Sequence, residues 1–308
     1  MDAPNPPFAT EICRYGKAAI TEATRLIRAG WPVAVPTETV YGLAADARSG
    51  EAVARIYAVK GRPSFNPLIV HIGSRADAER IASFNDAARA LADAHWPGPL
   101  TLVLPLRPGS GIASLVTAGL PTIALRMPAH PAMRALIEAS GAPLAAPSAN
   151  ASGRISPTRA EHVLASLAGR IPLIIDAGPT HHGLESTIVA VTDDRIRLLR
   201  PGPIVVEAET QASDAIEAPG QLASHYAPTK RLRLDATDRR PEEWLIGFGD
   251  VMGDTSLSAS GDLVEAAAAL FDRLHSADAS DAAAIAVAPV PHAGLGIAIN
   301  DRLRRAAH

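Results

Sequence analysis

The residues best suited to chemistry lie in two strings of the sequence, residues 36–43 and residues 60–71. Lys60 and Arg62 end a helical pattern, and His71 closes an apolar, strand-like segment. Arginine offers a planar fork to phosphate, whereas lysine offers a mobile point charge. With the hydroxyls of the first string, these side chains predict a crevice for an anionic substrate. Taken alone, a Lys-x-Arg pair is more often a solvated helix end, because cations favour helix C-termini.

A turn of small polar residues, 147–153, forms a second candidate site. It follows the apolar segment 144–146, so a strand feeds the turn. Backbone amides and hydroxyls in such a turn can wrap an anion, here with Ser148 and Asn150. A plain turn is the equally good alternative.

A helix is predicted over residues 157–167. Thr158 and Glu161 have the spacing of a capping box, and Ser156 precedes the first proline of this segment. Ser156 is therefore expected at the helix start, where the helix dipole favours phosphate. The simpler alternative is an ordinary N-cap.

Other polar residues carry weaker signals. Arg126 and Arg200 each end a predicted strand and come before a proline, and a lone arginine at such a place is usually a surface residue. His181-His182 lies in a glycine-rich loop. No third ligand follows at a metal-binding spacing, so solvated loop histidines are a better interpretation than a zinc site.

Short apolar segments alternate with helical patterns, which predicts an α/β protein. A hairpin around Asp193-Asp194 makes its sheet mixed rather than purely parallel. Because open α/β sheets bind ligands at the carboxyl ends of their strands, we expect the candidate residues to meet there. The predicted helices are 17–29, 51–60, 76–84, 86–94 and 157–167, and the predicted strands are 33–35, 68–72, 101–104, 122–125, 144–146, 173–175, 187–191 and 195–199.

The composition of the sequence changes near residue 208. A polar stretch broken by Pro219-Gly220 predicts a linker. We therefore expect three parts: a catalytic domain over 1–207, a linker or lid over 208–230, and a small C-terminal α/β domain over 231–308. The strands predicted in the last part are 232–234, 245–248 and 284–287, and its helices are 263–274 and 295–305.

The composition narrows the class of protein. A net charge of −3 means that any affinity for phosphate must come from a local patch. Three Trp, four Tyr and five Phe are too few for an extended platform that stacks bases. The single cysteine, Cys13, permits neither an internal disulfide nor a cysteine zinc site. Residues 1–7 lack a signal-peptide pattern and no apolar run approaches 18 residues, so a cytoplasmic protein without membrane contact is expected.

Together these strings resemble the YrdC-like family, the threonylcarbamoyl-AMP synthases. The resemblance spans roughly residues 15–205, and a C-terminal segment around 224–228 and 294–303 resembles the long form with an extra domain. One departure is the run 218–224, which lacks the usual Ser-Pro-Gly-Met and basic residue before His-Tyr-Ala-Pro. The matching strings are PTETVYGLAADA (36–47), KGRPSFNPLIVH (60–71), WPGPLTLVL (96–104), ALRMPAHP (124–131), APSANASGRISPT (146–158), LESTIV (184–189) and LLRPG (198–202).

The resemblance implies a twisted, open mixed sheet with a concave ligand cleft, followed by a small Rossmann-like domain. It implies synthesis of threonylcarbamoyl-AMP and pyrophosphate from L-threonine, bicarbonate or CO₂, and ATP, with Mg²⁺ carried by ATP and no side-chain metal ligand. The catalytic residues implied are Lys60 and Arg62. The ATP residues implied are Arg62, Asn66, Thr122, Ser148, Asn150, Ser156, Arg200 and Tyr226. The threonine residues implied are Thr39, His71, Arg126, Ala146 and Ser186.

By the same resemblance, the product supplies the t6A37 modification of tRNA through a separate tRNA threonylcarbamoyl-transferase complex. Weak RNA binding is a secondary expectation. The alternative is a double-stranded RNA or nucleotide-binding module of the same fold without this activity, which the low aromatic content and the net acidity disfavour. A carbamoyl-transfer maturation domain shares the fold type, but its cysteine zinc modules are ruled out by the single cysteine.

Overall fold

The computed structural model describes residues 8–192, 195–209, 217–220 and 225–308. Parts of three predictions lie outside these residues. They are the N-terminal segment 1–7, the hairpin turn Asp193-Asp194, and the linker residues 210–216 and 221–224.

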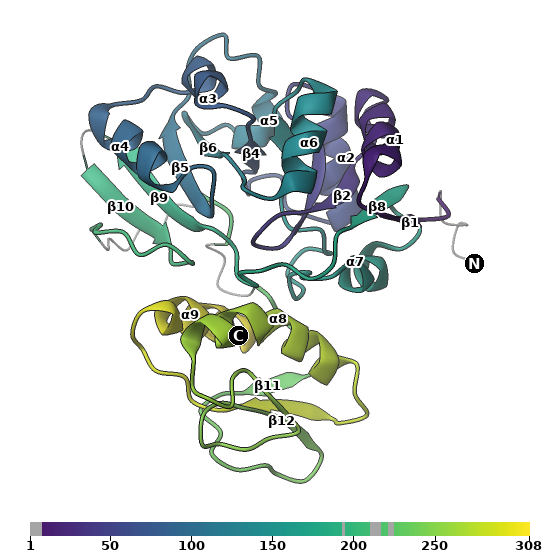
Figure 1. The fold of residues 1–308 in the computed structure, drawn as a ribbon, viewed down its shortest axis with the longest axis vertical. Helices are drawn as coiled ribbons and strands as arrows, with labels where there is room; N and C mark the ends of the chain where they lie inside the picture. Colours follow the sequence, from purple (N-terminus) through teal and green to yellow (C-terminus); the bar gives the residue numbers. More distant parts are fainter. Residues whose placement is uncertain (1–7, 193–194, 210–216, 221–224) are drawn as a thin grey trace.

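Ten strands of the described residues form one twisted mixed sheet (Figure 1). Their order across the sheet is β1-β8-β2-β3-β7-β4-β6-β5-β9-β10. The sheet contains parallel pairs, such as β4 with β6, and antiparallel pairs, such as β2 with β3. The strands are β1 (Glu11–Arg14), β2 (Val33–Pro36), β3 (Tyr41–Asp46), β4 (Ile69–His71), β5 (Leu100–Pro105), β6 (Thr122–Arg126), β7 (Leu144–Ala145), β8 (Leu173–Asp176), β9 (Thr187–Thr192) and β10 (Arg195–Arg200).

Helices cover the sheet unevenly. Alternate residues of a strand point to opposite faces, so Leu43 and Ala45 of β3 join one core and Ala44 joins another. The first core packs against α2, α3, α4, α5 and α7, whereas the second packs against α1 and α6. These helices are α1 (Lys17–Arg28), α2 (Gly50–Lys60), α3 (Arg75–Ile81), α4 (Asp86–His95), α5 (Ser114–Thr117), α6 (Pro131–Ser140) and α7 (Ala160–Leu167).

The face beneath α1 and α6 continues past these helices. Ile69, Val103 and Ile188 form a small apolar cluster there, and the covering residue is Ala218 of the linker. A cavity borders both this cluster, at Ile69, and the core under α1 and α6, at Ala146.

A second sheet follows the linker. Its strands are all parallel, in the order β11-β14-β12-β13, and two helices pack on it. The first domain contributes Val40, Ile155 and Leu184 to this core, so the two units share an apolar interface. The elements are β11 (Arg231–Arg233), β12 (Glu243–Gly247), β13 (Thr255–Ser256), β14 (Ala284–Val287), α8 (Leu263–Asp278) and α9 (Leu295–Ala306).

Several sequence-based expectations are wrong in detail. The segment between the predicted strand 33–35 and the predicted helix 51–60 is not all loop, because residues 41–46 form β3, which pairs with β2. Alanine and glycine dominate β3, and both faces of it are buried, so no polar–apolar alternation marks it as a strand. Strands β1 and β13 and helices α5 and α6 were likewise not predicted.

The predicted start of the helix over 157–167 is also wrong. Helix α7 begins at Ala160, and its N-cap residue Arg159 makes no side-chain cap. Ser156 instead donates a hydrogen bond to Glu185 (2.5 Å), and the backbone oxygen of Pro157 accepts from Tyr41 (2.8 Å). Ser156 and Pro157, which were expected at the helix start, therefore make tertiary contacts instead.

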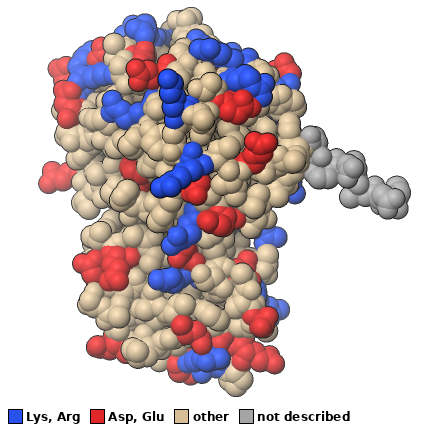
Figure 2. Space-filling view, turned by 45° about the vertical axis from the view of Figure 1, so that its right-hand side comes forward, with Lys and Arg blue, Asp and Glu red and all other residues tan. Residues whose placement is uncertain are grey.

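Figure 2 shows that Lys and Arg are intermixed with Asp and Glu on the face it displays, without a continuous basic stripe. Among the described residues, no helix combines the length and the apolar character needed to cross a membrane.

Candidate active site

A cavity of about 50 Å³ lies on the partly uncovered face of the large sheet. All five residues expected to hold threonine line it, together with three of those expected to hold ATP. The expected residues in its lining are Thr39, Arg62, His71, Arg126, Ala146, Ser148, Ser186 and Arg200. The cavity also touches Glu185 and, from the linker, Pro219.

Three residues of this lining, His71, Arg126 and Arg200, each end a strand, as expected of a site at the carboxyl ends of strands, but the cavity also extends over the face of the sheet. Ile69 and His71 point to the same face of β4, and the register places them beside Ala124 and Arg126 of β6. Antiparallel pairing of β7 with its neighbours β3 and β4 sends carboxyl ends to both edges of the sheet, so no single edge collects them. The site therefore also extends over the face.

Gly42 keeps this face open. A Cβ atom at position 42 would lie 3.3 Å from the Cβ of Ala146 and 3.7 Å from the oxygen of Pro147. A larger residue would push the 146–148 segment away from β3, where a bridge joins Gly42 to Ser148.

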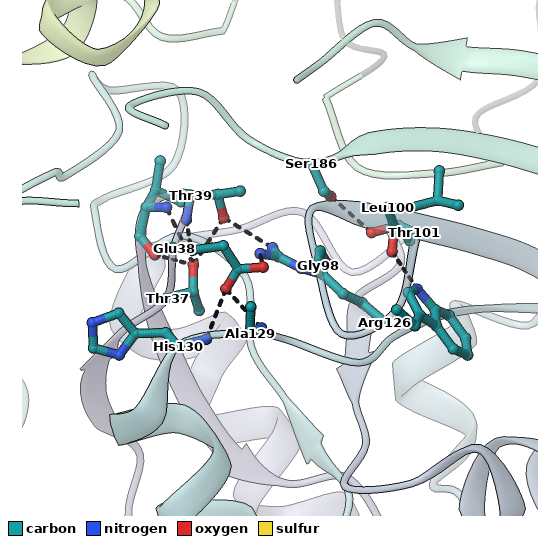
Figure 3. A network of polar contacts seen from close by, with 12 residues as sticks. Thr37, Glu38, Thr39, Gly98, Leu100, Thr101, Arg126, Ala129, His130 and Ser186 are labelled. Carbon is teal, nitrogen blue, oxygen red and sulfur yellow. Dashed lines mark hydrogen bonds and ion pairs between the residues drawn. The ribbon is translucent and has the colours of Figure 1, made fainter. Parts of the chain in front are cut away.

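Arg126 is held on three sides (Figure 3). Its Nη2 donates to Glu38 Oε1 (2.6 Å), its Nη1 to Thr39 Oγ1 (2.9 Å), and its Nε to the oxygen of Gly98 (3.2 Å). Burial alone would raise the pKa of Glu38, but the charge and hydrogen bond of Arg126 and nearby backbone N–H groups hold this pKa at about 2. The pair is therefore ionised, with a guanidinium fixed at the cavity wall.

His71 enters the cavity as a neutral ring. Burial, followed by the charge of Arg126, lowers the pKa of His71 to about 3. Its Nδ1 has no hydrogen-bond partner within the described part of the chain. Because buried polar atoms are normally bonded, this nitrogen is suited to a ligand.

Ser186 is fixed by two neighbours. Its hydroxyl lies 2.7 Å from the hydroxyl of Thr101 (Figure 3) and accepts from Nη2 of Arg200 (3.1 Å). The guanidinium of Arg200 also donates to the Ser186 backbone oxygen through Nε (3.1 Å) and Nη2 (2.9 Å). Arg200, which is expected at ATP, is thus bonded directly to Ser186, which is expected at threonine.

Lys60 and Arg62 have different positions. The Lys60 ammonium donates to the backbone oxygens of Ser148 (2.7 Å) and Asn150, behind the cavity wall, and it is not among the lining residues. Burial and then the charge of Arg62 lower the pKa of Lys60 well below its usual value. Arg62 lines the cavity, with its guanidinium donating to the oxygens of Asn66 (3.2 Å) and Pro67 (2.9 Å).

The other residues expected at ATP are not part of the lining of this cavity. Asn66 and Asn150 are buried, and both amide atoms of Asn66 and the amide oxygen of Asn150 lack partners among the described residues. Thr122 starts β6 opposite Pro105, at the far end of that strand from Arg126. Tyr226 is fully buried in the core shared with the C-terminal domain.

Two carboxylates at the site were not singled out from the sequence. Glu38 binds Arg126, and Glu185 accepts from Ser156 (2.5 Å) and from Nε of Arg302 in α9 (2.9 Å). Burial would raise the pKa of Glu185, but the charge of Arg302 makes the net shift downward. Glu38 lies inside the first string of residues, yet only the fold reveals its partner 88 positions away.

A metal cage is not found. Within the described residues, no group of three or more His, Cys, Asp or Glu side chains is arranged to hold a metal ion. A larger groove of about 990 Å³ lies between α3, α6 and the loop after β5, and it contains none of the expected site residues.

The chain is similar to known proteins over both of its domains. A family described as "Telomere recombination" (Sua5_yciO_yrdC) matches residues 25–202, and one described as "Threonylcarbamoyl-AMP synthase, C-terminal domain" matches residues 184–308. The threonylcarbamoyl-AMP synthase of Bacillus subtilis is 41% identical over 94% of this chain and 92% of its own length. That of Pyrococcus abyssi is 41% identical over 92% of this chain and 93% of its own.

The fold comparison covers both domains. The crystal structure of P. abyssi Sua5 complexed with L-threonine matches with a TM-score of 0.87 and 37% identity, covering 97% of this chain and 97% of that chain.

Proposed function

The chain belongs to the YrdC-like family of threonylcarbamoyl-AMP synthases, and from this premise we propose that it makes threonylcarbamoyl-AMP and pyrophosphate. The substrates are L-threonine, bicarbonate or CO₂, and ATP. The observation that carries the proposal is the single cavity lined by all five residues expected at threonine, with Arg62, Ser148 and Arg200 beside them.

The reaction has two bond-forming steps. The threonine amine first adds to carbon dioxide with loss of a proton, or to bicarbonate with loss of water, and forms a carbamate. A carbamate oxygen then attacks the α-phosphorus of ATP, and the bond to pyrophosphate breaks. Such a transfer depends on positioning and charge stabilisation more than on covalent help from the protein.

The threonine side of the cavity suits an amino acid. Arg126 donates to the carboxylate, and Thr39, which is bonded to Arg126, borders the same pocket. The neutral His71 ring and the hydroxyl of Ser186 are left for the amine or the hydroxyl of threonine. Ala146 contributes its backbone.

The nucleotide side uses cations and the turn after β7. Arg62 and Arg200 face the phosphates and stabilise the charge that builds during transfer. Lys60 acts by holding the Ser148–Asn150 turn through its two carbonyl contacts. The unpartnered amide of Asn66 and the unpartnered amide oxygen of Asn150 are further groups proposed for ATP. Ser156, Thr122 and Tyr226 complete the proposed set.

Mg²⁺ is proposed to enter on the phosphates of ATP, where it neutralises charge on the leaving pyrophosphate. Mg²⁺ in phosphoryl-transfer sites is bound largely through the substrate phosphates rather than by a protein cage. Glu185 borders the cavity, but its two oxygens accept from Ser156 and Arg302, so no side-chain ligand for Mg²⁺ is proposed.

Each of three parts of the chain is proposed to have a separate role. Residues 1–207 perform catalysis, 208–230 cover the site, and 231–308 support that cover. The product then passes to a separate tRNA threonylcarbamoyl-transferase complex, inside the cytoplasm. Weak RNA contact is a subordinate proposal, for which the intermixed charge in Figure 2 gives little support.

The direct test is to incubate the protein with ATP, threonine and labelled bicarbonate. A labelled adenylate that needs all three substrates supports the proposal. Nucleotide binding without labelled product, in the presence of Mg²⁺, contradicts it.

A further inference from the structure

Glu38 lies in the turn between β2 and β3, one residue before Thr39, and both side chains reach the same guanidinium (Figure 3). The turn itself is fixed by Thr37. Its hydroxyl accepts from the backbone N–H groups of Thr39 (3.1 Å) and Val40 (3.2 Å), and donates to the oxygen of Val40 (2.7 Å). Glu38 is thus held in place before any ligand arrives.

The carboxylate of Glu38 is fully used. Oε1 accepts from Arg126, and Oε2 accepts from the backbone N–H groups of Ala129 (3.1 Å) and His130 (3.2 Å). His130 is the N-cap residue of α6, where the helix dipole favours an anion. The carboxylate therefore connects the start of α6 to Arg126.

This arrangement fixes the direction of the Arg126 guanidinium. The Arg126 and Glu38 side chains are 4% and 9% exposed, so little water competes for their contacts. A guanidinium has five N–H groups, and three of them donate to Glu38, Thr39 and Gly98. The two that remain lie on the terminal nitrogens, which are the ones a carboxylate can grip in a bidentate manner.

We propose that Glu38 is a positioning residue for the amino-acid substrate, because it sets the orientation of Arg126 toward the substrate carboxylate. This inference rests on the proposed function. Glu38 does not touch the substrate; it acts through Arg126.

Glu38→Gln is a sharp test of this role. An amide has one acceptor oxygen and one donor nitrogen, whereas Glu38 is surrounded by donors on both sides. Whichever way the amide turns, its nitrogen faces either Arg126 or the two backbone N–H groups. The guanidinium then loses its fixed direction while the volume of the side chain is unchanged.

A matched control exists in the C-terminal domain. Glu243 is also 9% exposed at its side chain, binds Arg233 (2.6 Å) and accepts from the backbone N–H of Arg240 (3.1 Å). Glu243→Gln therefore removes a comparable charge at a distance from the cavity. It should lower stability without changing substrate affinity.

The experiment is calorimetry of the full chain with three probes: L-threonine, L-threoninamide and α,β-methylene-ATP. We expect Glu38→Gln to weaken threonine binding by roughly 10- to 100-fold, as for loss of a charge-assisted contact. The nucleotide analogue should bind within about twofold of the unaltered protein. Threoninamide lacks the carboxylate charge, so its affinity should be weak and nearly equal in the two proteins.

The other outcomes are decisive. Threonine affinity equal to that of Glu243→Gln overturns the inference, as does an equal loss for threonine and threoninamide, because the effect would then not pass through the carboxylate. Loss of nucleotide affinity as well overturns it in favour of a general structural role. If Glu38→Gln is insoluble, Glu38→Asp keeps the charge on a shorter side chain and should show a smaller, threonine-only loss. Absence of threonine binding by the unaltered protein would instead overturn the proposed function.

Discussion

The guanidinium of Arg302 in α9 lies 2.9 Å from the carboxylate of Glu185, which borders the cavity in the other domain. Arg302 is 0% exposed. It also donates to the oxygen of Pro201 (2.8 Å) and to Asp301 (2.9 Å). A buried charge from the C-terminal domain thus neutralises an acidic group of the catalytic domain, and the two domains are electrostatically dependent on each other.

Arg302→Met should therefore be strongly destabilising. It leaves the buried carboxylate of Glu185 without its cationic partner, while Asp301 keeps its ion pair with Arg305 (3.1 Å). Breaking a buried pair in this way costs about 3–5 kcal/mol. Urea unfolding measures this loss. Arg304→Met is the control, because Arg304 is exposed on the same helix and should change stability by no more than about 0.5 kcal/mol. Adding Glu185→Gln to Arg302→Met should recover part of the loss; full additivity of the two changes would argue against a direct coupling.

The pH dependence of stability should report on Glu38. Its pKa in the folded protein is about 2, below the usual 4.5, so its stabilising contribution is present above pH 4.5 and is lost as the pH falls toward 2. The full contribution corresponds to on the order of 3 kcal/mol. Unfolding free energies measured from pH 6 to pH 2.5 should fall more steeply for the unaltered protein than for Glu38→Gln. Parallel curves would contradict the assigned ionisation.

Arg62→Ala should reduce adenylate formation by about 10²-fold or more, as is typical for loss of a charge-stabilising group. The structural reason is that its guanidinium is braced by the oxygens of Asn66 and Pro67 and borders the cavity. Arg48→Ala is a suitable control, because Arg48 is exposed and pairs with Asp46 (2.9 Å) outside the site. Turnover close to that of the control would remove Arg62 from the phosphate role.

The amino-acid side chain should be read mainly through its hydroxyl. Polar groups on Thr39, His71 and Ser186 converge on one small cavity. Threonine should be preferred to serine by only about 1–3 kcal/mol, the worth of one methyl group in a pocket. Loss of the hydroxyl in 2-aminobutyrate should cost more, because buried polar partners stay unpaired. Competition assays with the three amino acids give the order, and equal rates with 2-aminobutyrate would contradict a hydroxyl-reading site.

Most regular elements could be predicted from local pattern. Helix α2 is an example, with Ser49 accepting from the N–H of Ala52 (3.2 Å) at its start and Gly61 in a left-handed conformation (φ 59°) at its end. Strand β3 could not, because its small residues are buried on both faces. The prediction for Ser156, a helix start, was wrong. Its actual partner, Glu185, lies 29 residues away and leaves no local signal in the sequence. The spacing of residues in a sequence predicts only contacts between near neighbours along the chain. The hydrogen bond between Ser156 and Glu185 forms only once the sheet has assembled.

The site was predictable in its composition and less so in its arrangement. The resemblance to a known family supplied the residues at threonine, and the structure brings all five to one cavity. The roles of Glu38 and Arg302 had no local signal, since a carboxylate in a polar string and an arginine in an amphipathic helix are both ordinary surface residues by pattern. Only burial together with a bonded partner distinguishes them.

Pro219 of the linker borders the cavity, and the far end of the linker is bonded to both domains. The backbone N–H of His225 donates to Arg305 in α9 (3.1 Å), and that of Ala227 donates to Gly153 beside the turn after β7 (2.8 Å). Between them Tyr226 is fully buried and has a left-handed backbone (φ 67°). Its ring packs on Phe271 at 5.6 Å.

The last prediction is that this segment is a lid that must open for ATP. A volume of about 50 Å³ is far below the roughly 300–1,000 Å³ of typical ligand pockets. Gly220 permits closure, because it has φ 86° and a Cβ there would lie 2.9 Å from the hydroxyl of Tyr226 and 3.1 Å from Arg200. Gly220→Ala should therefore prevent closure, retain nucleotide binding and release the hydrolysable adenylate.

Two further experiments test the same lid. Tyr226→Ala should release free adenylate to a smaller extent, and cleavage by protease near Gly220 should fall when ATP and threonine are both present. Truncation near residue 205 should also lose most synthesis, with added instability, because it exposes Ile155 and Leu184 and leaves Glu185 unpaired. Full synthesis by Gly220→Ala, with no extra free adenylate, would mean that the linker is an inert tether.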